Sequence, residues 1–392
     1  MTTSPEVDLG HLGIDRGGHL LVERALRSMA PGAELVVAGR DPHLGVHLGA
    51  WARRQGHRAV GHTIVKGDAD AARWQGSQRA GPPAPQGIWE KAPRSWGLAA
   101  RGALVERGGP DLDTADLDTK SAVWSDLAPK LYAQAAAAQW DPATAVDWDA
   151  AIGLSTEVET AVVQVMTYLV ENEQAALMVP ARFLGRVHPH YRETAQFLAV
   201  QVADEARHIE VFSRRALLVQ GRFGTSGAGG RASLQTLLDE PEFSVASFLL
   251  SVLGEGTFLH LLAFIARHAP DPVTAQVCQL ALQDEARHVA FGLAHLEEQL
   301  RAEPDLRHRL RLAVQRRHDA LASTSGLNDD VFDALVVLAA GEWSPEAIGR
   351  GYDAVAFLQD EMDEGRRRRL GRLGFAPPEA AELSSLHTRN FM

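Results

Sequence analysis

Apolar residues recur three and four positions apart over most of the chain after residue 119, which is the spacing of one helix face. Four long helices are expected at 156–184, 191–220, 245–267 and 272–302. Shorter helices are expected at 121–139, 304–322, 330–341 and 345–368, followed by an irregular tail. A flexible loop is expected at 221–230, where the sequence is GRFGTSGAGG. The pattern predicts a mainly α chain, with a four-helix bundle over 119–302 and accessory C-terminal helices over 303–392.

The third long stretch is apolar enough to resemble a membrane span. Residues 244–266 read SVASFLLSVLGEGTFLHLLAFIA, and their length suits a bilayer. Glu255 lies near the middle of this stretch, and a central carboxylate is costly in lipid. We therefore expect a buried helix of the bundle and no membrane contact.

The first 70 residues alternate between short helical and extended patterns. Helices are expected at 20–29 and 45–55, and strands at 34–38 and 58–66. Such alternation predicts a small α/β sandwich over 1–70. Residues 71–118 are rich in Gly, Pro, Ala and Trp and have no clear periodicity, which predicts a linker or an irregular wrap.

This N-terminal segment resembles the small bacterial sulfur-carrier family of TusA type. The resemblance rests on the segments VDLGHLGIDRGG, LRSMAPGAELVV, RDP and WARRQGH. That family carries a persulfide on a cysteine that precedes a proline, whereas Asp15 and Arg16 stand at the aligned positions here. Because no thiol is present, the resemblance implies a docking or structural module rather than a sulfur relay.

Composition narrows the class of protein. The formal net charge of -11 argues against a nucleic-acid-binding surface. Cys278 is the only cysteine, which excludes an internal disulfide framework and any Cys-rich zinc or iron–sulfur site. The N-terminus has no basic region followed by an apolar run, so we expect no signal peptide and a cytoplasmic location.

The pentapeptide Asp-Glu-Ala-Arg-His occurs twice, at 204–208 and at 284–288. Each copy places a Glu and a His three residues apart, so both side chains project from one face of a helix. A carboxylate and an imidazole in this arrangement can bind one metal ion together. One such pair alone is commonly a surface ion pair, but a duplicated pair predicts a metal site with two halves.

In known helical bundles that hold two metal ions, each half also has a Glu from a neighbouring helix. Glu255 lies thirty residues before Glu285, in the middle of an apolar face. For the other half, Glu171 and Glu173 are both candidates, on opposite sides of their helix. We choose Glu173, since its helical neighbours are Met166, Leu169, Val170, Ala176 and Leu177, and a buried carboxylate needs a partner.

The proposed metal ligands are Glu173, Glu205, His208, Glu255, Glu285 and His288. Their four carboxylates match two divalent cations in charge, and the set is too rich in oxygen for a structural zinc. Iron is the expected metal, with manganese or a mixed pair as alternatives. The alternative to a metal site is a set of Glu–Arg ion pairs on amphipathic helices. Such pairs would not explain why two carboxylates lie on apolar helix faces.

Other polar residues have weaker claims. Asp204 and Asp284 are candidates to accept a hydrogen bond from a ligand histidine, or else to pair with Arg207 and Arg287 on the helix surface. Cys278 is expected to be a small core residue, and His260 and His295 to be satisfied helix histidines. The run of arginines at 366–369 is expected to be a solvated helix end.

From residue 119 to about residue 302 the chain resembles the ferritin-like di-iron carboxylate oxygenases and oxidases. That group includes bacterial multicomponent monooxygenase hydroxylases, arylamine N-oxygenases and ribonucleotide reductase small subunits. Phe212 stands four residues after His208, where radical-carrying reductase subunits place a Tyr, so the resemblance disfavours radical storage. It implies oxygen activation at the six proposed ligands.

The expected function is therefore an oxygenase or oxidase acting on O2 and a small organic substrate. The alternative is a ferroxidase-like or metal-handling protein without an organic substrate. No flavin, nicotinamide or iron–sulfur motif is visible, so electrons are expected from an external reductase or from the substrate. Such a reductase, or a carrier protein, is expected to dock on the N-terminal domain, and a homodimer is possible in this family.

Overall fold

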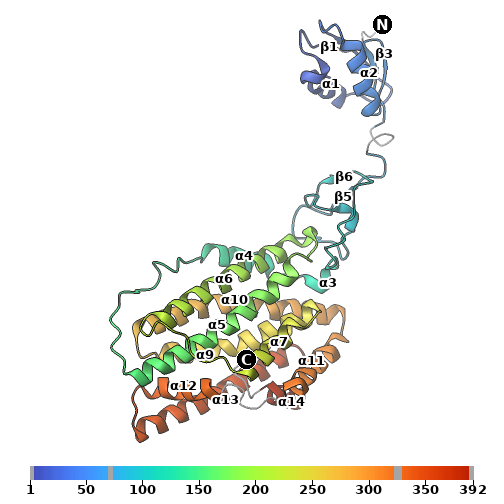
Figure 1. Cartoon of the computed structure of the whole chain (residues 1–392). Helices are drawn as coiled ribbons and strands as arrows, with labels where there is room; N and C mark the ends of the chain where they lie inside the picture. Colours follow the sequence, from blue (N-terminus) through green and yellow to red (C-terminus); the bar gives the residue numbers. More distant parts are fainter. Residues whose placement is uncertain (1–3, 69–73, 322–328, 388–392) are drawn as a thin grey trace. The chain divides into compact units, whose positions relative to one another are not determined.

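The computed structural model describes residues 4–68, 74–321 and 329–387 (Figure 1). The chain divides into two compact units. One consists of Met1–Ile88 with Pro93–Leu112, and the other of Trp89–Ala92 with Asp113–Met392. The first carries the small sheets and the second carries the long helices.

The first unit begins with an α/β sandwich. Its four-stranded sheet has the order β1 (Glu6–Asp8), β2 (Glu34–Ala38), β4 (Thr63–Val65) and β3 (Arg58–Val60). β1 runs parallel to β2, and the other two pairs are antiparallel. The helices are α1 (Gly18–Arg27) and α2 (Leu44–Arg54). Leu35 and Ile64 from the sheet and Val22 and Leu48 from the helices are fully buried in one core.

The predicted strand at 34–38 is confirmed, but the single strand predicted at 58–66 is wrong. Gly61 has a φ of 57°, which L residues rarely adopt, and it turns the chain between β3 and β4. The two strands form a hairpin. Beyond them, β5 (Gln78–Arg79) pairs with β6 (Leu104–Val105), with irregular chain between.

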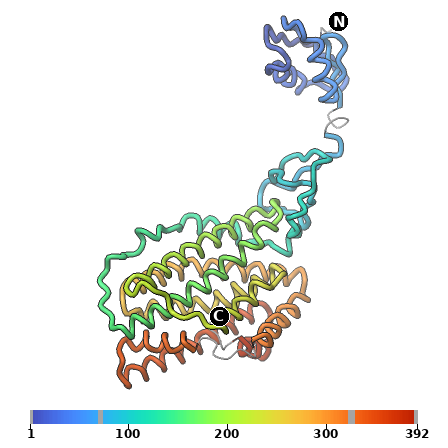
Figure 2. The backbone as a smooth tube through the Cα atoms, viewed as in Figure 1, coloured from blue at the N-terminus to red at the C-terminus, as the bar shows by residue number. Residues whose placement is uncertain are grey.

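The second unit is a ferritin-like four-helix bundle with additional helices. Its helices are α3 (Lys120–Val123), α4 (Ala128–Ala137), α5 (Thr156–Leu184), α6 (Arg192–Leu217), α7 (Ala228–Leu238), α8 (Phe243–Ser247), α9 (Gly256–His268), α10 (Pro272–Ala302), α11 (Leu306–Leu321), α12 (Asp329–Ala340), α13 (Pro345–Arg372) and α14 (Pro377–His387). α5 packs along α6, and α10 packs along α9 (Figure 2).

The bounds predicted for α5 and α10 are confirmed, and their capping residues explain why. Ser155 accepts a hydrogen bond from the backbone N–H of Val158 at the start of α5. Asp271 does the same for Thr274 at the start of α10, with Pro272 in the first turn.

Three expectations for segments outside the four long helices are wrong. The helix expected at 121–139 is broken between α3 and α4. The loop expected at 221–230 already contains the start of α7. The tail expected to be irregular forms α14 as far as His387, and its last five residues lie outside the described part.

One bundle helix contains a π-helical segment. Between α8 and α9, Phe248–Glu255 is wound with wider turns, and Glu255 is its last residue. The Arg369 guanidinium donates to the carbonyl of Val252 at 2.7 Å. Gly256 lets it approach, because a Cβ there would lie 2.4 Å from Arg369 Nε. Such segments are rare and often mark functional sites.

The whole helix Phe243–His268 is long and apolar enough to cross a membrane by length and composition. However, 83% of its most apolar window is buried inside the protein. The prediction of a buried bundle helix is confirmed.

α10 lies so close to the π-helical segment that only a glycine fits between them. A Cβ on Gly292 would lie 2.5 Å from the Cβ of Ser251. We expect Gly292→Ala to lower the free energy of unfolding by about 1–3 kcal/mol, because overpacking displaces the two helices. Gly349→Ala, in α13, meets no atom within 4 Å and is expected to raise it by about 0.5–1 kcal/mol. Urea denaturation of both variants measures the difference, and equal effects would contradict the close contact.

Candidate metal centre

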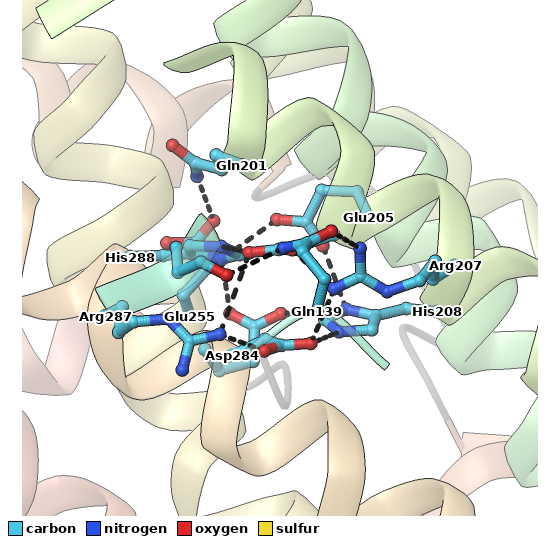
Figure 3. Close-up of polar contacts among 12 residues, drawn as sticks. Gln139, Gln201, Glu205, Arg207, His208, Glu255, Asp284, Arg287 and His288 are labelled. Atoms are coloured by element: carbon cyan, nitrogen blue, oxygen red, sulfur yellow. Dashed lines mark hydrogen bonds and ion pairs between the residues drawn. The ribbon is translucent and has the colours of Figure 1, made fainter. Parts of the chain in front are cut away.

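The structure brings all six proposed ligands to one place inside the bundle. α5 carries Glu173, α6 carries Glu205 and His208, the π-helical segment carries Glu255, and α10 carries Glu285 and His288. All six side chains are buried. Figure 3 shows the centre of this cluster, where side chains from different helices converge.

The six residues form two overlapping groups, each with ligand atoms within 4.8 Å of one another. One group consists of Glu173, Glu205, His208 and Glu285. The other consists of Glu205, Glu255, Glu285 and His288. Glu205 and Glu285 belong to both groups. This is the arrangement of two neighbouring metal positions, each with its own Glu and His, joined by two shared carboxylates.

Both imidazoles turn the same ring nitrogen toward the carboxylates. Nδ1 of His208 lies 3.1 Å from Glu205 Oε2 and 3.5 Å from Glu285 Oε1. Nδ1 of His288 lies 3.1 Å from Glu205 Oε1 and 3.5 Å from Glu285 Oε2. The Nδ1 atoms are thus placed to bind metal, while the Nε2 atoms face outward.

The cluster contains buried polar atoms that hydrogen bonding does not satisfy. These are Glu173 Oε1, Glu205 Oε1, Glu255 Oε2, both oxygens of Glu285 and His288 Nδ1. Buried polar atoms normally have a partner, and so many orphans in one place are unfavourable in a protein interior. Cations are the partners that carboxylate oxygens and an imidazole nitrogen share, so the donor set fits two divalent metal ions.

The electrostatic interactions among these side chains lead to the same conclusion. Burial, together with Glu205 and Glu285, raises the pKa of Glu173 well above its ordinary value. Burial and Glu285 likewise raise the pKa of Glu255. The pKa of His288 is well above its ordinary value, since Glu205 and Asp204 outweigh burial. Protons thus compensate the acidic charge where cations would do so, and metal binding is expected to release them.

Asp204 and Asp284 lie beside the histidines, and each accepts a hydrogen bond from the His of the other pentapeptide. Nε2 of His208 donates to Asp284 Oδ2 at 3.2 Å, and Nε2 of His288 donates to Asp204 Oδ2 at 3.2 Å. Such bonds fix the tautomer that presents Nδ1 to the metal.

Each aspartate therefore both accepts a hydrogen bond from a histidine and pairs with arginine, so the two roles predicted for it occur at the same time. Arg207 donates to Asp204 and to Asp284, and Arg287 donates to Asp284. The expectation of a helix-surface location is wrong, however, because both aspartates are at most 1% exposed.

Three residues near the centre have no counterpart in the sequence-based prediction. Gln139 donates to Asp204 at 3.1 Å, and the indole of Trp140 donates to Asp284 at 2.8 Å. They stand in an irregular segment, so no periodicity marks them. Gln201 donates to Glu255 at 3.0 Å (Figure 3). It lies one turn before Glu205 on the same helix face, which is a signal that could have identified it.

Three other residues were candidates in the sequence, and the structure shows where each of them lies. Glu171 is only half-buried and belongs to neither ligand group among the described residues. Cys278 is buried, and burial raises the pKa of its thiol. The Nδ1–H of His295 donates to the Trp124 carbonyl at 2.9 Å, and its Nε2 accepts from the Ser244 hydroxyl at 3.0 Å, as expected of a satisfied histidine.

Two corrections concern the arginine run. Arg367 and Arg368 are solvated, as expected. Arg366 and Arg369 are buried instead, because α14 and the π-helical segment cover their side of α13.

In the first unit, Asp15 lies on the surface beside His47, with 3.7 Å between Oδ1 and Nδ1. Together with Asp41 these groups are close enough to hold a cation, but Asp15 is exposed and the other two are only partly buried. The likeness of this unit to the TusA-type carriers stays a prediction.

No protein-family model and no curated protein matches the chain. Among solved structures, an R2-like ligand-binding oxidase from Sulfolobus acidocaldarius has 15% identity and a TM-score of 0.43, over 66% of this chain and 94% of that one. A mutant R2-like ligand-binding oxidase with an aerobically reconstituted Mn/Fe cofactor has 21% identity and a TM-score of 0.47, over 64% and 94%. Another, with an anaerobically reconstituted Mn/Fe cofactor, has 20% identity and a TM-score of 0.47, over 63% and 94%. At these identities the likeness concerns the fold alone.

Proposed function

We propose that this chain is an oxygen-dependent oxidoreductase that holds two iron ions and oxidises a small organic substrate. Manganese, or one ion of each metal, also suits the donors. The observation that supports the proposal is the pair of ligand groups that share Glu205 and Glu285 in a fully buried position. Two ferrous ions there would supply electrons to dioxygen, which no side chain of the site can do.

Side chains of the protein would position the ions and keep water from them. Glu205 and Glu285 belong to both ligand groups and would hold both ions, while Glu173 and Glu255 would each hold one of them. Asp284 and Asp204 keep His208 and His288 in the tautomer with Nδ1 free for metal.

Aromatic rings cover the histidines and keep water away. The ring centroid of Phe212 lies 6.3 Å from that of His208, and Phe197 lies at the same distance from His288. Both phenylalanines are fully buried. A phenyl ring at Phe212 has no hydroxyl to oxidise, which is why we propose substrate oxidation rather than storage of a radical there.

The proposal is tested by oxygen uptake of the protein loaded with Fe(II) without air. We expect about two irons per chain, a single round of uptake, and further uptake only with reductant and an organic substrate. The ferroxidase-like alternative predicts continued uptake with added Fe(II) alone and many ferric ions per chain. That result, or a failure to bind iron or manganese, would overturn the proposal.

Electron delivery from a separate reductase or carrier that docks on residues 1–70 is part of the same proposal. A chain without these residues is expected to keep its metal and to lose turnover driven by the partner. Full partner-driven turnover by that shortened chain would remove the N-terminal domain from the proposal.

A further inference from the structure

A pocket between α12 and α13 is separate from the proposed metal centre. The two helices pack against each other on the outside of the bundle (Figure 1). The pocket has a volume of about 580 Å³, and its lining comes from both helices and from the turn between them. None of the six proposed metal ligands lines it. We refer to it as the aromatic pocket.

Three aromatic side chains give the pocket its name. They are Phe332 on α12, Trp343 in the turn and Tyr352 on α13. The rings of Phe332 and Tyr352 stand at 70° to each other, with their centroids 5.7 Å apart. Trp343 is 67% exposed and Tyr352 is 56% exposed, so much of both side chains is accessible to a ligand. Exposed apolar side chains that gather at one place, rather than singly, mark an interaction site.

Aliphatic side chains form the inner part of the aromatic pocket. Val336 and Val337 are at most 8% exposed, and Ile348 is partly buried. Sites for small molecules commonly have volumes of about 300–1,000 Å³ and mostly apolar walls with a few polar groups. The size and the lining of this pocket therefore suit a small molecule with an apolar body.

Acidic groups surround the aromatic pocket. Asp333 is part of the lining. Three further acidic residues adjoin lining residues in the sequence, and all three are exposed: Glu342, Glu346 and Asp353. Among the described residues that line the pocket, none is a lysine or an arginine. Arg350 is the only basic residue within 329–353, and its guanidinium lies 3.9 Å from the carboxylate of Glu342. The charge around the pocket is therefore negative, and a cation is the complementary ligand.

We propose that the aromatic pocket binds an organic ammonium ion that carries an apolar body. The face of an aromatic ring attracts a cation, and that of Trp does so most strongly. Asp333 supplies a negative charge in the same lining, and the aliphatic side chains accommodate the rest of the ligand. The aromatic rings alone would also suit a neutral molecule, so the carboxylates are what specify the charge of the ligand. This site is additional to the oxidoreductase activity proposed above.

Binding is tested on the full chain by calorimetric titration at constant ionic strength. The probes are benzyltrimethylammonium, choline, and the uncharged alcohol in which a carbon atom replaces the nitrogen of choline. We expect saturable binding of benzyltrimethylammonium, weaker binding of choline because its apolar body is smaller, and roughly tenfold weaker binding of the alcohol than of choline. Absence of binding by both cations, or equal affinities for choline and the alcohol, would overturn the proposal.

Variants of exposed residues locate the binding in the pocket. Trp343→Leu and Tyr352→Leu each remove a ring face but keep an apolar side chain, and Asp333→Asn removes a charge with little change of shape. Each is expected to weaken the binding of benzyltrimethylammonium by roughly three- to tenfold. Phe357→Leu is the matched control, because Phe357 is an aromatic residue on α13 that is 59% exposed and does not line the pocket. Parent-like binding by all three pocket variants, or equal weakening by Phe357→Leu, would overturn the proposal.

A second copy of the chain is the competing occupant of the aromatic pocket, because a dimer interface can also bury exposed aromatic side chains. Analytical ultracentrifugation of the parent and of Trp343→Leu distinguishes the two cases. We expect both to have the same oligomeric state, with and without benzyltrimethylammonium. Dissociation of a dimer by Trp343→Leu would assign the pocket to an interface between copies and would overturn the proposal.

The result does not depend on the chemistry of the metal centre. Glu205→Ala changes a proposed metal ligand and none of the residues that line the pocket. This variant should therefore bind benzyltrimethylammonium as the parent does, whatever its metal content. Loss of cation binding in Glu205→Ala would contradict a separate site and would overturn the proposal.

Discussion

Replacing Glu205 with alanine is expected to abolish metal binding at both positions. Glu205 is one of two carboxylates shared by the ligand groups, and its two oxygens face different histidines. Without it, each of the two ligand groups would lose one carboxylate. Glu173→Ala is expected to be milder, since Glu173 belongs to one group only, and should leave about one ion per chain.

The measurement is metal content per chain after loading with Fe(II) or Mn(II) and removal of free metal. Glu171→Ala is the matched control, because Glu171 lies two residues away on another side of α5 and outside both groups. It should keep the parent's content of about two ions. Parent-like content in Glu205→Ala, or equal losses in the Glu171 and Glu173 variants, would contradict the assignment of ligands.

Replacing Arg215 with methionine is expected to destabilise the bundle by about 3–5 kcal/mol at pH 7, the usual effect of breaking a buried ion pair. Arg215 is fully buried and donates to Glu159 through both terminal nitrogens, at 2.8 and 2.9 Å. It also donates to Asp271 at 2.8 Å and to Thr274 at 2.9 Å. This network joins α6 to the first turns of α5 and α10. Methionine fills a similar volume but leaves two buried carboxylates without their cation.

The loss should depend on pH in a defined direction. Although burial favours the neutral acid, hydrogen bonds from Arg215 and Thr274 hold the pKa of Asp271 below its ordinary value. A depressed pKa contributes stability above the unfolded-state pKa of about 4, and this contribution disappears as the pH falls further. The gap between parent and Arg215→Met should therefore narrow in acid.

Chemical denaturation at pH 7 and at about pH 3 measures both effects, because the contribution of Asp271 is lost only below its unfolded-state pKa of about 4. Arg214→Met is the neighbouring control. Arg214 is exposed and stacks over Trp148, 4.0 Å from the ring centroid, which is worth about 0.5–1 kcal/mol. A loss in Arg215→Met no larger than in this control would show that the network does not hold the bundle together.

The long bundle helices and the convergence of the six proposed ligands were predictable, because capping residues and residue spacing in the sequence already indicate them. Ser155 and the Asp271-Pro272 pair define the starts of α5 and α10 without reference to any neighbour. The duplicated pentapeptide identifies ligands by spacing alone, since helical geometry places Glu and His on one face. The choice of Glu173 over Glu171 followed from the apolar character of its face, which depends only on sequence.

Features that depend on packing between distant segments were not predictable. The pairing of each aspartate with the histidine of the other pentapeptide arises from how α6 lies against α10. The π-helical segment is apolar on all sides, so the order of apolar and polar residues does not reveal how it is wound. Its contact with Arg369 comes from α13, which is distant in the sequence. Arg366 looked solvated because the helix that covers it, α14, was itself not expected.

The adjacent residues Gln139 and Trp140 reach across both halves of the centre, one to each aspartate. Arg207 links them further, since it donates to Gln139 and stacks on the Trp140 ring. A single displacement of this short segment would free both imidazoles in the same event. The orientations of His208 and His288 are therefore expected to be coupled, although the two residues lie on different helices.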